Sequence, residues 1–201
     1  MAMMFITGRL LTKIQPKYLI VAGGSIIALS MYNLTSIYGD VGFWYLAHSR
    51  MLLGVGLPLI FLSITAASYE GISPANVDQA SALINVARNI GGSLGIALSS
   101  NVLAHREQFH QSRLVEHAVP SSAGYQETLR QAIDYFASHG SSALLAQKQA
   151  IAWIGQQVAT QASFLAFIDV FWTLMAISLS AAALALTLRK VKLGGHAPAA
   201  H

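Results

Sequence analysis

The 201-residue sequence contains no cysteine and very little charge. The lack of cysteine excludes disulfide bonds and thiolate chemistry. Only 10% of the residues are Asp, Glu, Lys or Arg, whereas soluble domains contain about 25%. The chain also lacks the GxSxG, P-loop, HExxH and CxxC patterns of common catalytic, nucleotide-binding and metal sites. These absences argue against a soluble enzyme, and we expect neither a cofactor nor a metal ion.

Apolar runs dominate what is present, because 54% of the residues are hydrophobic and the mean hydropathy is +0.53. The net charge is +4, but the basic residues lie mostly near the ends of the apolar runs. This pattern is typical of membrane orientation and not of a nucleic-acid partner. About 20 helical residues cross the hydrocarbon layer. The sequence therefore predicts an all-α protein of the lipid bilayer with four transmembrane helices, at about residues 18–37, 43–67, 80–104 and 162–188.

The segments between these spans have different compositions. Residues 1–17 are expected to form the end of a preceding helix and a cytoplasmic loop, and residues 38–40 a tight turn. Residues 105–161 are the most charged part, and their apolar stripes predict amphipathic helices that lie on the membrane or on the protein. A partner-binding surface is the alternative for this helical outer loop. Residues 189–201 are expected to form a cytoplasmic tail, disordered after Leu193.

The distribution of basic residues predicts the orientation of the chain. Six of them flank the entrance to the first span and the exit from the last, against at most three on the other side. Basic residues accumulate on the cytoplasmic side of membrane helices. Both termini are therefore expected in the cytoplasm, with residues 105–161 outside. The six residues are Arg9, Lys13, Lys17, Arg189, Lys190 and Lys192.

The third predicted span contains residues that lipid disfavours. Asn85, Arg88 and Asn89 lie in its first half, and polar side chains within a membrane normally face a bundle interior or a wet cavity. Small residues follow them and allow two helix backbones to approach closely. The alternative is a glycine-rich helix in a soluble core. The small residues expected to pack helices here are Gly91, Gly92, Ser93 and Gly95.

Three ionisable residues lie inside or at the edge of the predicted spans: Arg50, Arg88 and Asp169. Intramembrane charges are candidates for a substrate path or for ion coupling. The alternative is that they reach the interface or fix helix packing. Arg50 and Asp169 enter from the same side, so they could meet. Gly54 and Gly56, which follow Arg50, are expected to pack helices.

Three histidines lie close together in the outer segment, at His105, His110 and His117. Their spacing does not suit a metal site on a helix, because His110 and His117 lie two turns apart, about 10 Å. We expect these histidines to be exposed to solvent.

Residues 80–106 resemble the penultimate helix of the fourteen-helix drug:proton antiporters of the major facilitator superfamily, the EmrB/QacA type. Residues 48–61 and 164–177 resemble the third-from-last and last helices of that family. Residues 7–19 resemble a second copy of its cytoplasmic-loop motif, with Thr12 where the full motif has Asp. The residues that carry the main match are Asn85, Arg88, Gly91, Gly92, Ser93, Gly95, Ala97 and Arg106.

The resemblance implies a C-terminal fragment of a proton-driven multidrug efflux transporter of the bacterial inner membrane, working by alternating access. It implies that the four spans are the last of fourteen and form part of the C-terminal bundle, incomplete on its own. The implied partners are the N-terminal helices, small amphiphilic drugs, and a periplasmic adaptor with an outer-membrane channel. The alternative is an independent four-helix membrane scaffold or accessory protein. The upstream gene sequence would distinguish the two, since ten more spans in frame support the fragment.

Overall fold

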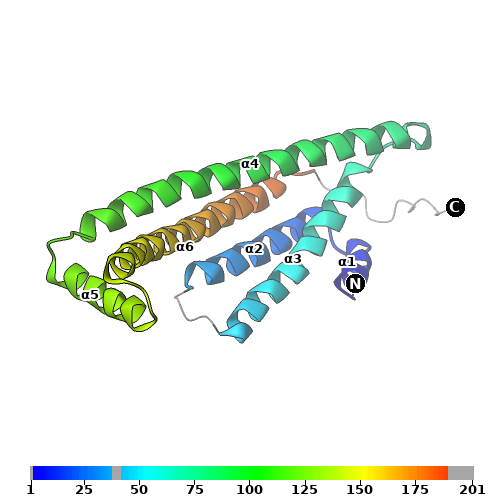
Figure 1. Ribbon diagram of the computed structural model, residues 1–201. Helices are drawn as coiled ribbons and strands as arrows, with labels where there is room; N and C mark the ends of the chain where they lie inside the picture. The colour runs from blue at the N-terminus through cyan, green and yellow to red at the C-terminus, as the bar shows by residue number, and fades with distance from the viewer. Residues whose placement is uncertain (1, 38–41, 190–201) are drawn as a thin grey trace. The chain divides into compact units, whose positions relative to one another are not determined.

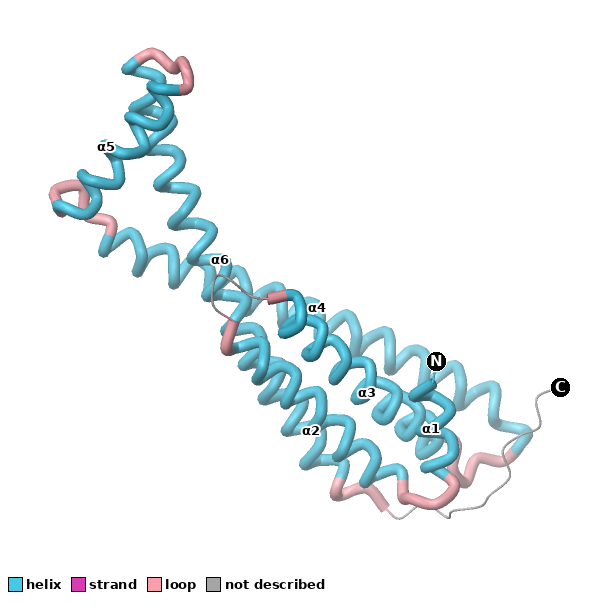
Figure 2. The backbone as a smooth tube through the Cα atoms, turned by 90° about the horizontal axis from the view of Figure 1, so that it is seen from below, coloured by secondary structure: helices cyan, strands magenta, loops and turns pink. Residues whose placement is uncertain are grey.

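The computed structural model describes residues 2–37 and 42–189, and every regular element in these ranges is a helix (Figures 1 and 2). The expected all-α class is therefore confirmed. The predicted turn at residues 38–40 and the tail from residue 190 lie outside the described residues. The helices are α1 (Ala2–Leu11), α2 (Pro16–Thr35), α3 (Phe43–Ser68), a 3-10 turn (Pro74–Asn76), α4 (Val77–His117), α5 (Ala123–Ser138) and α6 (Ala143–Ala185).

Local sequence signals explain several helix ends. Pro16 begins α2, where its fixed φ suits the helix and its missing N–H is not needed. Ser122 caps α5, because its hydroxyl accepts a hydrogen bond of 3.2 Å from the Tyr125 backbone N–H. Gly140 has a φ of +93° between α5 and α6, a conformation that glycine adopts without steric cost. The break after α5 therefore falls at this glycine.

Three helices of the described chain, α2, α3 and α6, are long and apolar enough to cross a membrane. They overlap three of the four predicted spans, 18–37, 43–67 and 162–188. The fourth, residues 80–104, lies within α4, whose hydropathy is lowered by Asn85, Arg88 and Asn89. No helix boundary falls at residue 104 or 162, since α4 continues to His117 and α6 begins at Ala143. The predicted outer loop thus contains the ends of two long helices together with α5.

The helices form two compact units. The first contains α1, α2 and α3 with the parts of α4 and α6 up to Ser99 and from Phe171. In this unit α2 contacts both α3 and α6 through adjacent glycines. A Cβ added to Gly23 would lie 2.9 Å from the carbonyl oxygen of Gly56 on α3, and one added to Gly24 would lie 3.0 Å from Ala182 Cβ on α6. Ser178 on α6 also donates a hydrogen bond of 2.8 Å to the Gly24 carbonyl.

The second unit extends from Ser100 to Val170 and contains the end of α4, all of α5 and the start of α6. In Figures 1 and 2, α5 lies between the end of α4 and the beginning of α6. Small side chains on α6 are fully buried at four-residue spacings, and such residues allow neighbouring helices to approach closely. These residues are Ala146, Ala150, Ala162 and Ala166.

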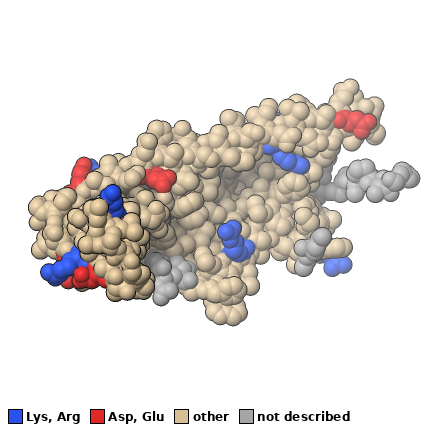
Figure 3. Space-filling model, in the orientation of Figure 1, with Lys and Arg blue, Asp and Glu red and all other residues tan. Residues whose placement is uncertain are grey.

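The described part of α4 contains no buried residue. Large apolar side chains along it, such as Leu83, Ile90 and Leu94, are exposed. Figure 3 shows that most of the visible face is uncharged, with several acidic and basic side chains over the end that contains α5 and separate charged side chains elsewhere. Apolar surfaces of this extent normally contact lipid or another protein.

Candidate functional site

Asp169 on α6 is bound by two side chains of α4 within the second unit. The Nε of Arg106 donates to Asp169 Oδ2 at 2.6 Å, and His110 Nε2 lies 2.6 Å from the same oxygen. Arg106 and His110 are four residues apart and therefore share one face of α4. An ionised carboxylate only accepts hydrogen bonds, so His110 Nε2 carries the hydrogen of this bond.

This cluster is partly shielded from water. The side chains of Arg106, Asp169 and His110 are 43%, 23% and 18% exposed. The hydrogen bond that Arg106 donates to Asp169, followed by the negative charge of Asp169, raises the pKa of Arg106 above its ordinary value, so Arg106 stays a cation. The Arg106–Asp169 pair carries no net charge. The cluster thus joins α4 to α6 through one ion pair and one histidine hydrogen bond.

A second contact joins the same two helices. Ser163 on α6 donates a hydrogen bond to the carboxylate of Glu107 on α4. Glu107 lies next to Arg106 in the sequence, so α4 presents a base and an acid side by side to α6. The two contacts fix α4 and α6 against each other.

The sequence identified Asp169 but not its partners. The prediction that His110 is exposed to solvent is wrong, because α4 continues beyond residue 104 and turns both Arg106 and His110 towards α6. One sequence pattern could have identified Arg106 and His110. It is a basic residue and a histidine four residues apart in one helix, followed by an apolar span that contains an acidic residue. Arg50 and Asp169 belong to different units, so their proposed approach stays a prediction.

Arg88 on α4 lies over an aromatic ring of α3 in the first unit. Its guanidinium carbon is 4.4 Å from the centroid of the Phe61 ring, a distance suited to a cation–π interaction. Its terminal nitrogen also lies 3.5 Å from the Thr65 hydroxyl. Arg88, Asn85 and Asn89 are exposed in the described structure. In the polar part of α4, Arg88 thus contacts α3, and Asn85 and Asn89 lie exposed on the surface of the described structure.

The small residues that were expected to pack helices occupy two kinds of surroundings. Gly56 contacts α2, since an added Cβ would lie 2.7 Å from Ile27 Cγ1. By contrast, a Cβ added to Gly54 on α3 or to any of three glycines of α4 would meet no atom of another described element within 4 Å. Ser93 and Arg50 are exposed. The described chain therefore leaves the small face of α4 uncovered. The three glycines are Gly91, Gly92 and Gly95.

Comparison with known proteins found no matching family model and no matching solved structure. The chain is 29% identical to the fatty acid resistance protein FarB of Neisseria gonorrhoeae over 60% of its own length and 24% of that protein. It is 26% identical to the multidrug export protein EmrB of Escherichia coli K12 over 63% of the chain and 23% of the relative. The corresponding EmrB of Haemophilus influenzae is 24% identical over 83% of the chain and 31% of the relative.

The alignments therefore span about a quarter to a third of the length of these relatives. They agree with the resemblance that residues 80–106 carry and with the long apolar helices of the fold. The chain is a distant homologue of the EmrB- and FarB-type multidrug exporters of the major facilitator superfamily.

Proposed function

We propose that the chain is part of a proton-driven multidrug exporter of the bacterial inner membrane. The observation that carries this proposal is the similarity to multidrug export proteins over as much as 83% of the chain. In the proposal, α2, α3, α4 and α6 each cross the membrane, both termini lie in the cytoplasm, and residues 105–161 lie outside. The complete transporter binds small amphiphilic drugs in a cavity that opens alternately to either side.

The surface of α4 supports its place inside a larger bundle. Its small residues, Gly91, Gly92, Ser93 and Gly95, lie exposed beside Asn85, Arg88 and Asn89. Lipid is a poor neighbour for the polar side chains, whereas another helix can pack closely against the small ones. We assign this face to contact with the remaining helices of the transporter, with Arg88 and the two asparagines near the substrate path.

The Asp169 cluster supports a part in proton coupling. It holds an acid, a base and a histidine within hydrogen-bonding distance between two helices that we assign to the membrane. Histidine exchanges protons at physiological pH more readily than any other unperturbed side chain. Arg50 is a further candidate on the same side of the predicted membrane. The outer segment is the part of the chain available to a periplasmic adaptor that connects to an outer-membrane channel.

A split exporter tests the proposed function. E. coli EmrB without the segment that aligns with this chain is expressed together with the 201-residue chain in cells that lack their own EmrB. We expect the two pieces to purify together and to restore drug resistance, and neither piece alone to do so. Stable membrane insertion of the chain without any association would favour the independent scaffold. Drug efflux by the purified chain alone would contradict an incomplete transporter.

A further inference from the structure

The second unit contains an aromatic pocket that the proposed function does not use. Its volume is about 520 Å³, and it lies between α5 and α6. Small-molecule sites usually have volumes of about 300–1,000 Å³. The pocket therefore has room for a small organic ligand. Its lining residues are Thr128, Gln131, Ala132, Tyr135, Phe136 and Trp153.

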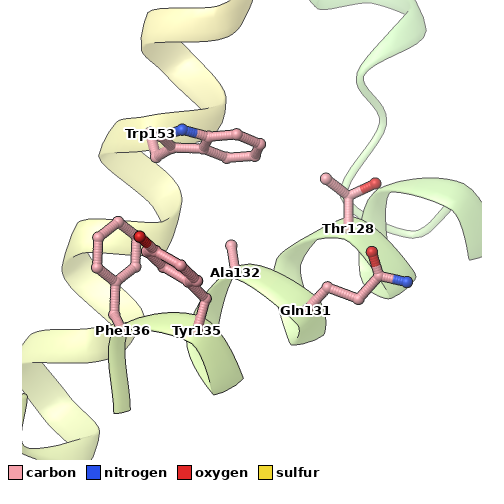
Figure 4. A pocket seen from close by; sticks show the side chains of 6 residues that line it. All are labelled: Thr128, Gln131, Ala132, Tyr135, Phe136 and Trp153. Atoms are coloured by element: carbon pink, nitrogen blue, oxygen red, sulfur yellow. The ribbon is translucent and has the colours of Figure 1, made fainter. Parts of the chain in front are cut away.

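The hollow exists because a small residue lies between larger ones. Ala132 on α5 is buried, and Trp153 reaches over it from α6 in Figure 4. The figure shows Tyr135 and Phe136 on one side of Ala132, with Gln131 and Thr128 on the other. The pocket thus has an aromatic end and a polar end.

The aromatic end favours flat ring systems. The rings of Tyr135 and Phe136 pack edge to face, with centroids 5.4 Å apart, and Trp153 adds an indole from the facing helix. Aromatic rings gain about 0.5–1.5 kcal/mol from stacked or edge-on contact with another ring, beyond the gain from burial. Tyr135 and Trp153 are 58% and 43% exposed in the described structure, so a ligand there would remove large apolar surface from water.

The polar end favours an uncharged ligand with one hydrogen-bond donor. None of the six lining residues is charged, and a charged ligand would lose hydration there without a counter-charge in the lining. The amide nitrogen of Gln131 donates to Glu127 Oε1 at 2.8 Å. This bond fixes the amide, and its carbonyl oxygen can then accept a hydrogen bond from a ligand.

We infer that this pocket binds uncharged, planar aromatic molecules that carry a hydrogen-bond donor. A bound molecule contacts α5 and α6 together and stabilises their packing. The site lies outside the predicted membrane spans, and the inference does not depend on the proposed transport activity.

The test uses Trp153 as its own reporter. The chain has three tryptophans, so Trp44→Phe and Trp172→Phe leave a single indole, and Phe at 172 keeps a ring against Tyr32. This parent is placed in lipid nanodiscs and titrated with 2-naphthol, which is planar, uncharged at neutral pH and carries one O–H donor. We expect saturable quenching of the Trp153 fluorescence.

Matched variants separate the pocket from the lipid. Ala132→Leu fills the hollow and should weaken binding at least tenfold, whereas Ala137→Leu makes the same change at an exposed position of α5 outside the pocket. Gln131→Leu should weaken 2-naphthol about 2- to 10-fold and leave naphthalene, which has no donor, unchanged. Helix content measured by circular dichroism confirms that each variant is folded.

Two results would overturn the inference. One is quenching that rises linearly in every variant, which is the behaviour of a probe that only partitions into lipid. The other is equal saturable binding in the Ala132→Leu and Ala137→Leu variants. Because Gln131→Leu leaves the pocket open, its selectivity between 2-naphthol and naphthalene tests the site even if Ala132→Leu does not fold.

Discussion

Replacement of Gly23 by alanine should weaken the packing of α2 against α3. The new Cβ would lie 2.8 Å from Ile60 Cγ1 and 2.9 Å from the Gly56 carbonyl oxygen. The Ile60 side chain can rotate away, but the carbonyl belongs to the backbone of α3, so the helices must separate by several tenths of an ångström. Overpacking of this kind costs about 1–3 kcal/mol, and the better helix propensity of alanine returns about 0.5–1 kcal/mol. The net loss should be about 0–2.5 kcal/mol.

The same substitution at Gly54 provides the control. Gly54 also lies inside a helix, but an added Cβ would meet no atom within 4 Å. Gly54→Ala should therefore stabilise the chain by about 0.5–1 kcal/mol, because only the gain in helix propensity remains. The two variants test packing alone, since the chemical change is identical and only the distance to the neighbouring helix differs.

Unfolding by sodium dodecyl sulfate in mixed micelles, followed by circular dichroism, measures both changes. A double variant, Gly23→Ala with Gly56→Ala, should lose less than the sum of its single changes, because both force the same separation of α2 and α3. A Gly23→Ala chain as stable as Gly54→Ala would refute the close contact between these helices.

Three further predictions concern the proposed site and topology. Asp169→Asn should weaken α4–α6 packing by about 1 kcal/mol in the same unfolding assay, since the ion pair with Arg106 becomes a bond from a cation to a neutral amide in a partly exposed site; unchanged stability would argue against the ion cluster. In a reconstituted full-length transporter, Arg88→Ala and Arg88→Lys should both reduce efflux at near-normal membrane abundance, because an ammonium cannot reproduce the planar guanidinium. Normal efflux in Arg88→Ala would show that Arg88 has no part in the mechanism. Single cysteines at Ser121 and Ala199 should differ in labelling by an impermeant reagent in intact cells, with Ser121 labelled and Ala199 not; the reverse would contradict the topology.

Hydropathy predicted much of the fold, because the length of an apolar segment can be counted directly along the sequence. Residues 18–37, 43–67 and 162–188 overlap α2, α3 and α6. The C-terminal end of α4 and the N-terminal end of α6 were less predictable. Hydrophobicity falls after residue 104 and before residue 162, but the backbone hydrogen bonds of a helix do not depend on hydrophobicity, so α4 and α6 continue.

The candidate site was only partly predictable, because its partners lie far apart in the sequence. A charge inside an apolar run singled out Asp169, yet Arg106 and His110 precede it by 63 and 59 residues. Their role depends on the rotation of α4 and on its close contact with α6. Both the rotation and the contact are properties of helix packing, and helix packing cannot be inferred from the residue pattern of a single sequence.

The glycines of α2 have a mechanical consequence. Gly23 approaches α3 and Gly24 approaches α6, and neighbouring residues on a helix point about 100° apart. A rotation of α2 about its axis would replace a glycine with a larger side chain of α2 against the backbone of α3 or of α6. The two glycine contacts therefore resist rotation of α2 against α3 and against the part of α6 from Phe171.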